Sequence, residues 1–320
     1  MKTRLLAAAL ALSFSVQPST AQETAGEKES LTVSYVMFGV TPLKRYLGGP
    51  APGASWTMLD RIVAPGGLRL EVDGESTSVD VLAAAEDPLE LEILRDESRS
   101  MDFAERVSRS QELLRCFIDQ LQGRDVVRVA GFAEEGAEVR DAPTADRNVT
   151  HAALGDWPTS GATSLLEALV WLARDERPAG EALRRISLVV TDGGDNASRL
   201  SLRKARELLG RIEHPIIVLD AAGHERPYDQ SRPTRASLLL DEIVRATGGL
   251  RVSTAEPETA CLEAVQLARS HLLVGFPADP ASPNVRRRLR VRLAPDLSSE
   301  LRLRYRPNYI GHAPLRAGDR

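Results

Sequence analysis

The chain has 320 residues, enough for one large or two modest domains with an ample hydrophobic core. Its 41 basic and 45 acidic residues give a formal net charge of −4. A balance this close to neutral excludes a bulk electrostatic attraction to nucleic acid.

Residues 1–21 have the pattern of a secretory signal peptide. Lys2 and Arg4 form its positive end, an apolar core follows over 5–16, and small residues mark a cleavage site before Gln22. The apolar run is too short to cross a bilayer, and no later run is long enough either. We therefore expect a mature chain that is secreted or periplasmic and has no membrane span.

The N-terminal segment, residues 22–87, is predicted to be rich in β-structure. Residues 31–38 favour a strand by composition. Residues 68–72 alternate apolar and charged side chains and end in an Asp-Gly turn, which indicates a half-exposed strand. Residues 79–82 are expected to form its partner strand.

Strands and helices alternate from residue 88 to residue 272, which is the pattern of an α/β fold with a doubly wound, mostly parallel sheet. Beyond the apolar run that ends at Asp96, the expected strands are 126–132, with an antiparallel neighbour at 137–140, then 186–191 and 215–220, and the expected helices are 102–122, 163–173, 202–212, 235–246 and 257–270.

The C-terminal segment, residues 273–310, contains two stretches in which leucine or valine alternates with arginine, and residues 311–320 form a tail. We interpret the stretches at 288–293 and 301–306 as two strands joined by a polar turn. A lone hairpin is marginal in water, so these strands should share a sheet with the strands before residue 88, as a small β-module built from both chain ends. Their arginine faces would suit an anionic glycan or phosphate surface, or serve as an ordinary solvated face.

Three separated segments supply oxygen ligands. Asp96, Ser98 and Ser100 lie at alternate positions from the end of the first central strand, Thr163 begins a predicted helix, and Asp192 follows the apolar strand expected at 186–191. Carboxylate and hydroxyl oxygens suit Mg²⁺ or Ca²⁺. In doubly wound sheets ligands bind at the carboxyl ends of strands where the winding direction reverses, so the two carboxylates should face each other across a crevice.

These residues, in this order, resemble the metal-ion-dependent adhesion site of the von Willebrand factor A (VWFA) fold. Over about residues 65–310 the chain is similar to the secreted bacterial VWFA-related proteins, with which it shares Val-Asp-Gly-Glu at 72–75, Thr-Gly-Gly at 247–249 and Arg-Pro-x-Tyr at 306–309. The resemblance implies a VWFA domain over 88–272 in which the five side chains hold Mg²⁺, or Mn²⁺ or Ca²⁺. It also implies metal-bridged binding of a protein partner through an acidic side chain.

Two arginines depart from the family pattern, because Arg95 stands where an apolar residue is usual and Arg99 where glycine is usual. Either guanidinium could pair with the carboxylates and replace the cation. A metal-independent scaffold or assembly protein with a degenerate site is therefore the alternative. We expect no enzyme, since the sequence has no nucleophile elbow, phosphate loop, dinucleotide fingerprint or zinc-protease helix. Metal-assisted hydrolysis is a further alternative.

Cys116 and Cys261 fall in the first and last central helices. Free cysteines are commonly buried as small hydrophobic side chains, which is one interpretation of this pair. The other is a disulfide between them, which an even number of cysteines in an exported chain permits. The family fold implies that these helices are neighbours. A disulfide requires Cα atoms within about 7 Å of each other.

Overall fold

The computed structural model describes residues 33–42, 61–62, 64, 66–83, 87–139, 142–174, 184–223, 234–277 and 285–310. The predicted signal peptide over 1–21, the segment 22–32 and the tail over 311–320 lie outside the described residues.

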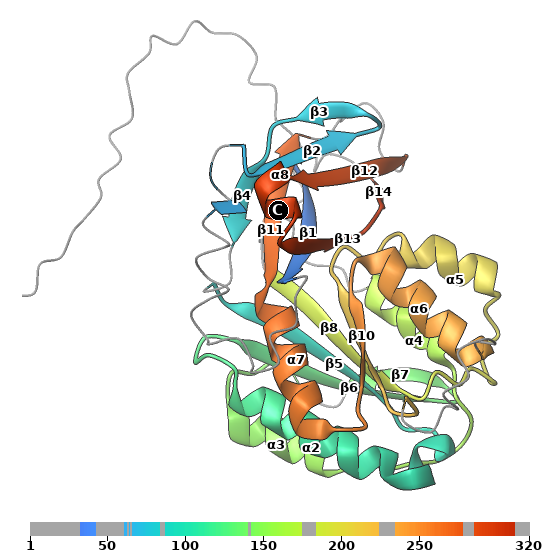
Figure 1. Ribbon diagram of the computed structural model, residues 1–320. Coiled ribbons are helices and arrows are strands. Elements are labelled where there is room, and N and C mark those ends of the chain that lie inside the picture. The colour runs from blue at the N-terminus through green and yellow to red at the C-terminus, as the bar shows by residue number, and fades with distance from the viewer. Residues whose placement is uncertain are drawn as a thin grey trace, which may run out of the picture. The chain divides into compact units, whose positions relative to one another are not determined.

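A six-stranded sheet of order β10-β9-β8-β5-β6-β7 forms the centre of the α/β part (Figure 1). All neighbouring strands are parallel except β7, which is antiparallel to β6. The predicted fold class is therefore confirmed. The strands are β5 (Leu89–Asp96), β6 (Val126–Ala133), β7 (Gly136–Val139), β8 (Arg184–Thr191), β9 (Ile216–Asp220) and β10 (Leu250–Ser253).

Helices cover both faces of this sheet, which is why its central strands read as nearly continuous apolar runs. Along β5, Leu91 and Ile93 join the core on one face, whereas Leu94 joins the core on the other. The first face carries α2 (Arg106–Asp119), α3 (Arg147–Gly155) and α7 (Pro257–Arg269), and the second carries α4 (Leu165–Arg174), α5 (Leu202–Leu209) and α6 (Arg235–Thr247).

Local signals set several helix ends. α6 begins where the side chain of Thr234 accepts a hydrogen bond from the backbone N–H of Ser237, and it ends at Gly248 with φ of 77°. The helix predicted from residue 102 starts instead with a 3-10 turn, η1 (Arg99–Glu105), before α2 begins. The short α3 was not predicted.

Two four-stranded sheets form the β-module. One has the order β13-β1-β11-β4 and the other β14-β12-β2-β3. Their strands are β1 (Val33–Pro42), β2 (Leu68–Val72), β3 (Glu75–Thr77), β4 (Asp80–Ala83), β11 (His271–Pro277), β12 (Arg286–Leu293), β13 (Leu301–Tyr305) and β14 (Asn308–Ile310), and the short helix α8 (Pro295–Ser298) lies between β12 and β13.

The predicted sharing of a sheet between the two chain ends is confirmed for β2 and β12, which pair antiparallel with Leu70 opposite Val291. The predicted hairpin of β12 with β13 is wrong, because α8 separates them and β13 pairs with β1. The predicted pairing of residues 79–82 with β2 is also wrong. The positive φ angles of Asp73 and Gly74 make a tight turn that brings β3 back along β2, and β4 pairs with β11.

The alternation predicted for the C-terminal strands is confirmed in β12. Leu289 and Val291 are buried in the core of the β-module, where Phe276 and Tyr309 meet edge to face with ring centroids 5.1 Å apart. The arginines that alternate with these two residues are exposed.

Cys116 in α2 and Cys261 in α7 form a disulfide, with Cα atoms 6.1 Å apart. The two helices lie on the same face of the six-stranded sheet, so the bond ties together elements 145 residues apart in sequence. Among the described residues, no helix combines the length and the apolar character that a membrane span requires.

Candidate functional site

The predicted site residues lie at the carboxyl ends of β5 and β8, which are adjacent strands in the sheet. From β5 the chain moves outward to β6 and then returns to the other side of β5 through β8, so the winding direction reverses between them. We call the loops over 97–105, 157–164 and 192–198 the crest.

Asp96 is the last residue of β5 and is completely buried. Its Oδ1 accepts a hydrogen bond from the backbone N–H of Ser98 at 3.0 Å, and its Oδ2 accepts one from the hydroxyl of Thr191 at 2.7 Å. Burial raises the pKa of Asp96 to about 7, and the nearby Asp192 carboxylate adds to the rise. A positive charge close to this pair would stabilise both ionised carboxylates.

The loop after Asp96 presents two hydroxyls. The Oγ atoms of Ser98 and Ser100 lie 3.0 Å apart. The loop is fastened to the loop over 157–164, since the indole N–H of Trp157 donates to the backbone oxygen of Asp96 at 2.8 Å and the N–H of Arg99 donates to that of Gly161 at 3.2 Å. These bonds keep the serine hydroxyls at the edge of the sheet.

Thr163 and Asp192 form the other half of the site. The N–H of Thr163 donates to Oδ1 of Asn196 at 2.7 Å, and the N–H of Asn196 donates back to the carbonyl of Thr163 at 3.0 Å. A Cβ placed on Gly194 would lie 3.0 Å from Oδ1 of Asp192 and 3.6 Å from Oγ1 of Thr163, so both oxygens border the same point. The structure thus brings the predicted residues together and adds Asn196, for which the sequence carried no signal.

The two arginines that depart from the family pattern take different positions. The Nε of Arg95 donates to Oε1 of Glu97 at 2.8 Å, and its guanidinium lies 5.3 Å from the ring centroid of Trp157. Arg99 is exposed at the crest. The arginine that pairs with a site carboxylate is Arg106, which sequence reasoning missed.

Arg106 donates from Nη1 to Oδ2 of Asp192 at 2.7 Å and to the backbone oxygen of Ser100 at 2.8 Å. The other oxygen of Asp192 accepts the N–H of Gly194 at 2.8 Å. The carboxylates and hydroxyls of the crest have the right chemistry for Mg²⁺. As arranged, however, they do not fit an ion, because a guanidinium already engages Asp192. Within the described residues, no cluster of three or more His, Cys, Asp or Glu side chains could hold a metal.

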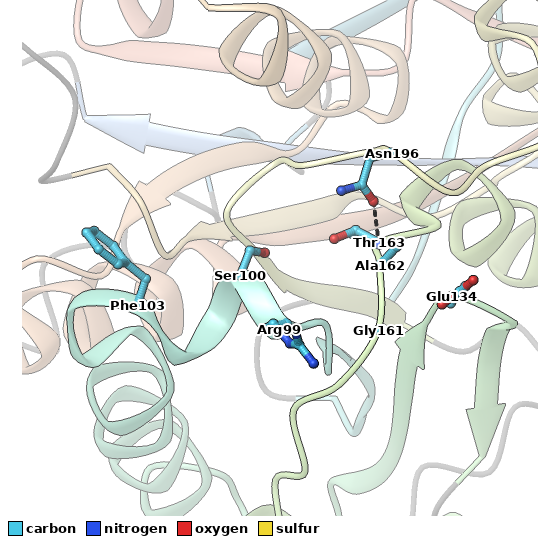
Figure 2. A pocket seen from close by; sticks show the side chains of 8 residues that line it. All are labelled: Arg99, Ser100, Phe103, Glu134, Gly161, Ala162, Thr163 and Asn196. Atoms are coloured by element: carbon cyan, nitrogen blue, oxygen red, sulfur yellow. Dashed lines mark hydrogen bonds between the residues drawn. The ribbon is translucent and has the colours of Figure 1, made fainter.

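A hollow of about 620 Å³ opens beside these residues (Figure 2). Arg99, Ser100 and Phe103 line it from the segment after β5, and Glu134 lines it from the turn between β6 and β7. The side chain of Phe103 is 64 % exposed. The remaining lining residues are Gly161, Ala162, Thr163 and Asn196.

No family model and no curated protein matches the chain. Among solved structures, an aerotolerance-related membrane protein from Bacteroides fragilis is similar at 20 % identity and a TM-score of 0.46, over 56 % of this chain and 98 % of that one. A von Willebrand factor type A protein from Catenulispora acidiphila is similar at 14 % identity and a TM-score of 0.45, over 78 % and 71 %.

Proximal thread matrix protein 1 from the mussel byssus, solved with a zinc-occupied MIDAS motif, is similar at 16 % identity and a TM-score of 0.45, over 62 % of this chain and 49 % of that one. The chain thus resembles VWFA domains. Metal binding at the crest stays a prediction.

Proposed function

We propose that this chain is an exported binding domain that recognises a protein partner at the crest, through an acidic side chain of that partner. The observation that carries the proposal is the hollow at the point where the sheet's winding reverses, directly beside the buried acid–hydroxyl cluster. Ligand sites of doubly wound sheets are expected at this place.

The chemistry of the hollow suits a carboxylate next to an apolar group. The exposed Arg99 guanidinium offers a fork of N–H donors, which matches the two oxygens of a carboxylate. Ser100 and Thr163 border the same hollow with hydroxyls, and Phe103 exposes an aromatic ring of the kind that dominates binding energy in interfaces. Glu134 also lines the hollow and would repel a second carboxylate of the partner. The partner's acidic group would therefore bind next to Arg99 and not next to Glu134.

The described residues favour binding over hydrolysis. One serine–histidine pair, Ser187 Oγ and His214 Nε2 at 2.7 Å, has the spacing of a nucleophile with its base. Ser187 is completely buried within β8 and His214 is 7 % exposed, so a substrate does not reach them. Their role is that of a satisfied polar pair between strand and loop.

The disulfide supports export. Structural disulfides persist in oxidising compartments and are rare in a reducing cytosol. The bond between Cys116 and Cys261 therefore agrees with the signal-peptide pattern of residues 1–21 and with a secreted or periplasmic location.

The test is capture of a partner by the mature chain, followed by affinity measurements on crest variants. Phe103→Ala and Arg99→Ala should each weaken binding about tenfold or more, because they remove the aromatic and charged contacts of the hollow. Leu262→Ala is the matched control, since Leu262 is 59 % exposed on α7 and is not among the residues that line the hollow. Equal affinity of wild type, Phe103→Ala and Arg99→Ala would place the partner elsewhere.

The same measurement separates the two forms of recognition. Binding that is lost on chelation supports the Mg²⁺, Mn²⁺ or Ca²⁺ bridge predicted from the sequence. Binding that survives chelation supports recognition without metal.

A further inference from the structure

We infer that Arg106 is the built-in cation of the crest site, so that the wild-type chain recognises an acidic group without a divalent metal ion. Arg106 is the first residue of α2, and its side chain is 11 % exposed. By donating to both Asp192 and the backbone of Ser100, it joins the loop after β8 to the loop after β5. That the crest binds a partner rests on the proposed function. That Arg106 supplies the positive charge next to Asp192 rests only on these hydrogen bonds.

Electrostatics favours the guanidinium over an ion at this position. A charged hydrogen bond of 2.7 Å between two mostly buried groups is strong, and breaking it by removing one partner is costly. Arginine stays protonated at every physiological pH. A divalent ion approaching Asp192 would meet that fixed positive charge and would have to displace it.

The backbone before Arg106 adopts an unfavourable conformation that sets its position. Ala104 and Glu105 have φ angles of 51° and 60°, in the left-handed region that residues other than glycine rarely occupy. These two residues end η1 and lead directly into α2, and strain of this kind gathers at functional sites. The ring centroid of Phe103 lies 5.2 Å from the guanidinium carbon of Arg106, a distance that allows a cation–π contact.

Recognition and charge balance are thus divided between two arginines. Arg106 compensates Asp192 from within, whereas the exposed Arg99 lies in the hollow where a partner's carboxylate would enter. In a site built around a metal, one ion would perform both tasks.

The first test is a calorimetric and thermal titration of the mature chain with Mg²⁺, Mn²⁺ and Ca²⁺. Wild type should give no binding heat and no shift in melting temperature. Arg106→Gln should bind an ion and gain about 5 °C at a hundredfold excess over Kd. Arg106→Lys keeps the charge and should stay silent, as should the matched control Arg115→Gln on the exposed side of α2. Saturable heat from wild type equal to that from Arg106→Gln would overturn the inference.

The second test needs no metal and covers the case in which Arg106→Gln alone fails to fold. Melting temperatures are compared for Arg106→Gln, Asp192→Asn and the double variant. Because either single variant already breaks the ion pair between Arg106 and Asp192, the double variant should lose less than the sum of the two single losses. Simple addition of the two losses would overturn the inference. Neither test uses a partner protein, so its failure is distinct from failure of the proposed function.

Discussion

Replacing both Cys116 and Cys261 with alanine removes the cross-link between α2 and α7. The closed loop spans a sequence separation of 145 residues, for which the chain-entropy model gives about 5 kcal/mol at 25 °C, since the unfolded chain regains the freedom that the bond removed. For a chain of this length, such a loss lowers the melting temperature by about 10 °C. Thermal and urea unfolding followed by circular dichroism measures both quantities.

The single variants make this prediction sharp. Cys116→Ala and Cys261→Ala should each lose nearly as much as the double variant, because either one breaks the bond. Wild type treated with reductant should fall to the same midpoint, whereas the double variant should not respond to reductant. Two small losses that simply add, together with a wild type indifferent to reductant, would refute the reasoning.

Two further predictions concern buried polar groups. Burial, with the nearby charge of Arg184, lowers the pKa of His271 from its usual 6.5 to about 4, so the unfolded chain takes up a proton first as the pH falls. The free energy of unfolding of wild type should therefore be highest above pH 6.5 and should fall by about 3 kcal/mol as the pH drops to 4. His271→Leu has no such group and should lack this fall in stability. Equal dependence of the unfolding free energy on pH in the two proteins would contradict the prediction. Gly131→Ala should cost about 3 kcal/mol, because the new Cβ would clash with the carboxylate of the buried Glu97, which pairs with Arg95. Gly123→Ala, with open space around it, serves as the control in the same urea titration.

The sequence by itself determined most of the segments that form helices and strands in the α/β part, and where the strands leading to Asp96 and Asp192 end. Apolar runs of strand length and helical repeats are local properties, so the α/β order could be read without knowing any contact. Asp96 and Asp192 come directly after two such runs, and parallel strands end at the same edge of a sheet. Their convergence with Thr163 was implied by the resemblance to the VWFA fold, because the order of the elements alone does not place β8 beside β5.

The tertiary structure alone decided which strands pair in the β-module. β13 alternates leucine with arginine, and this pattern shows which face is buried but not which strand lies alongside. The short sequence of β4 likewise does not identify its partner strand. The partners, β11 and β1, come from distant parts of the chain.

The charge balance of the site was likewise beyond the sequence. Its departures from the family pattern indicated an arginine in place of the cation and pointed to Arg95 and Arg99, which lie next to acids in the chain. Arg106 pairs with Asp192, 86 residues away, because a turn of left-handed backbone at the start of α2 brings them together. Pairing of charges depends on distance in space, and distance in space is fixed by the packing of helix against sheet.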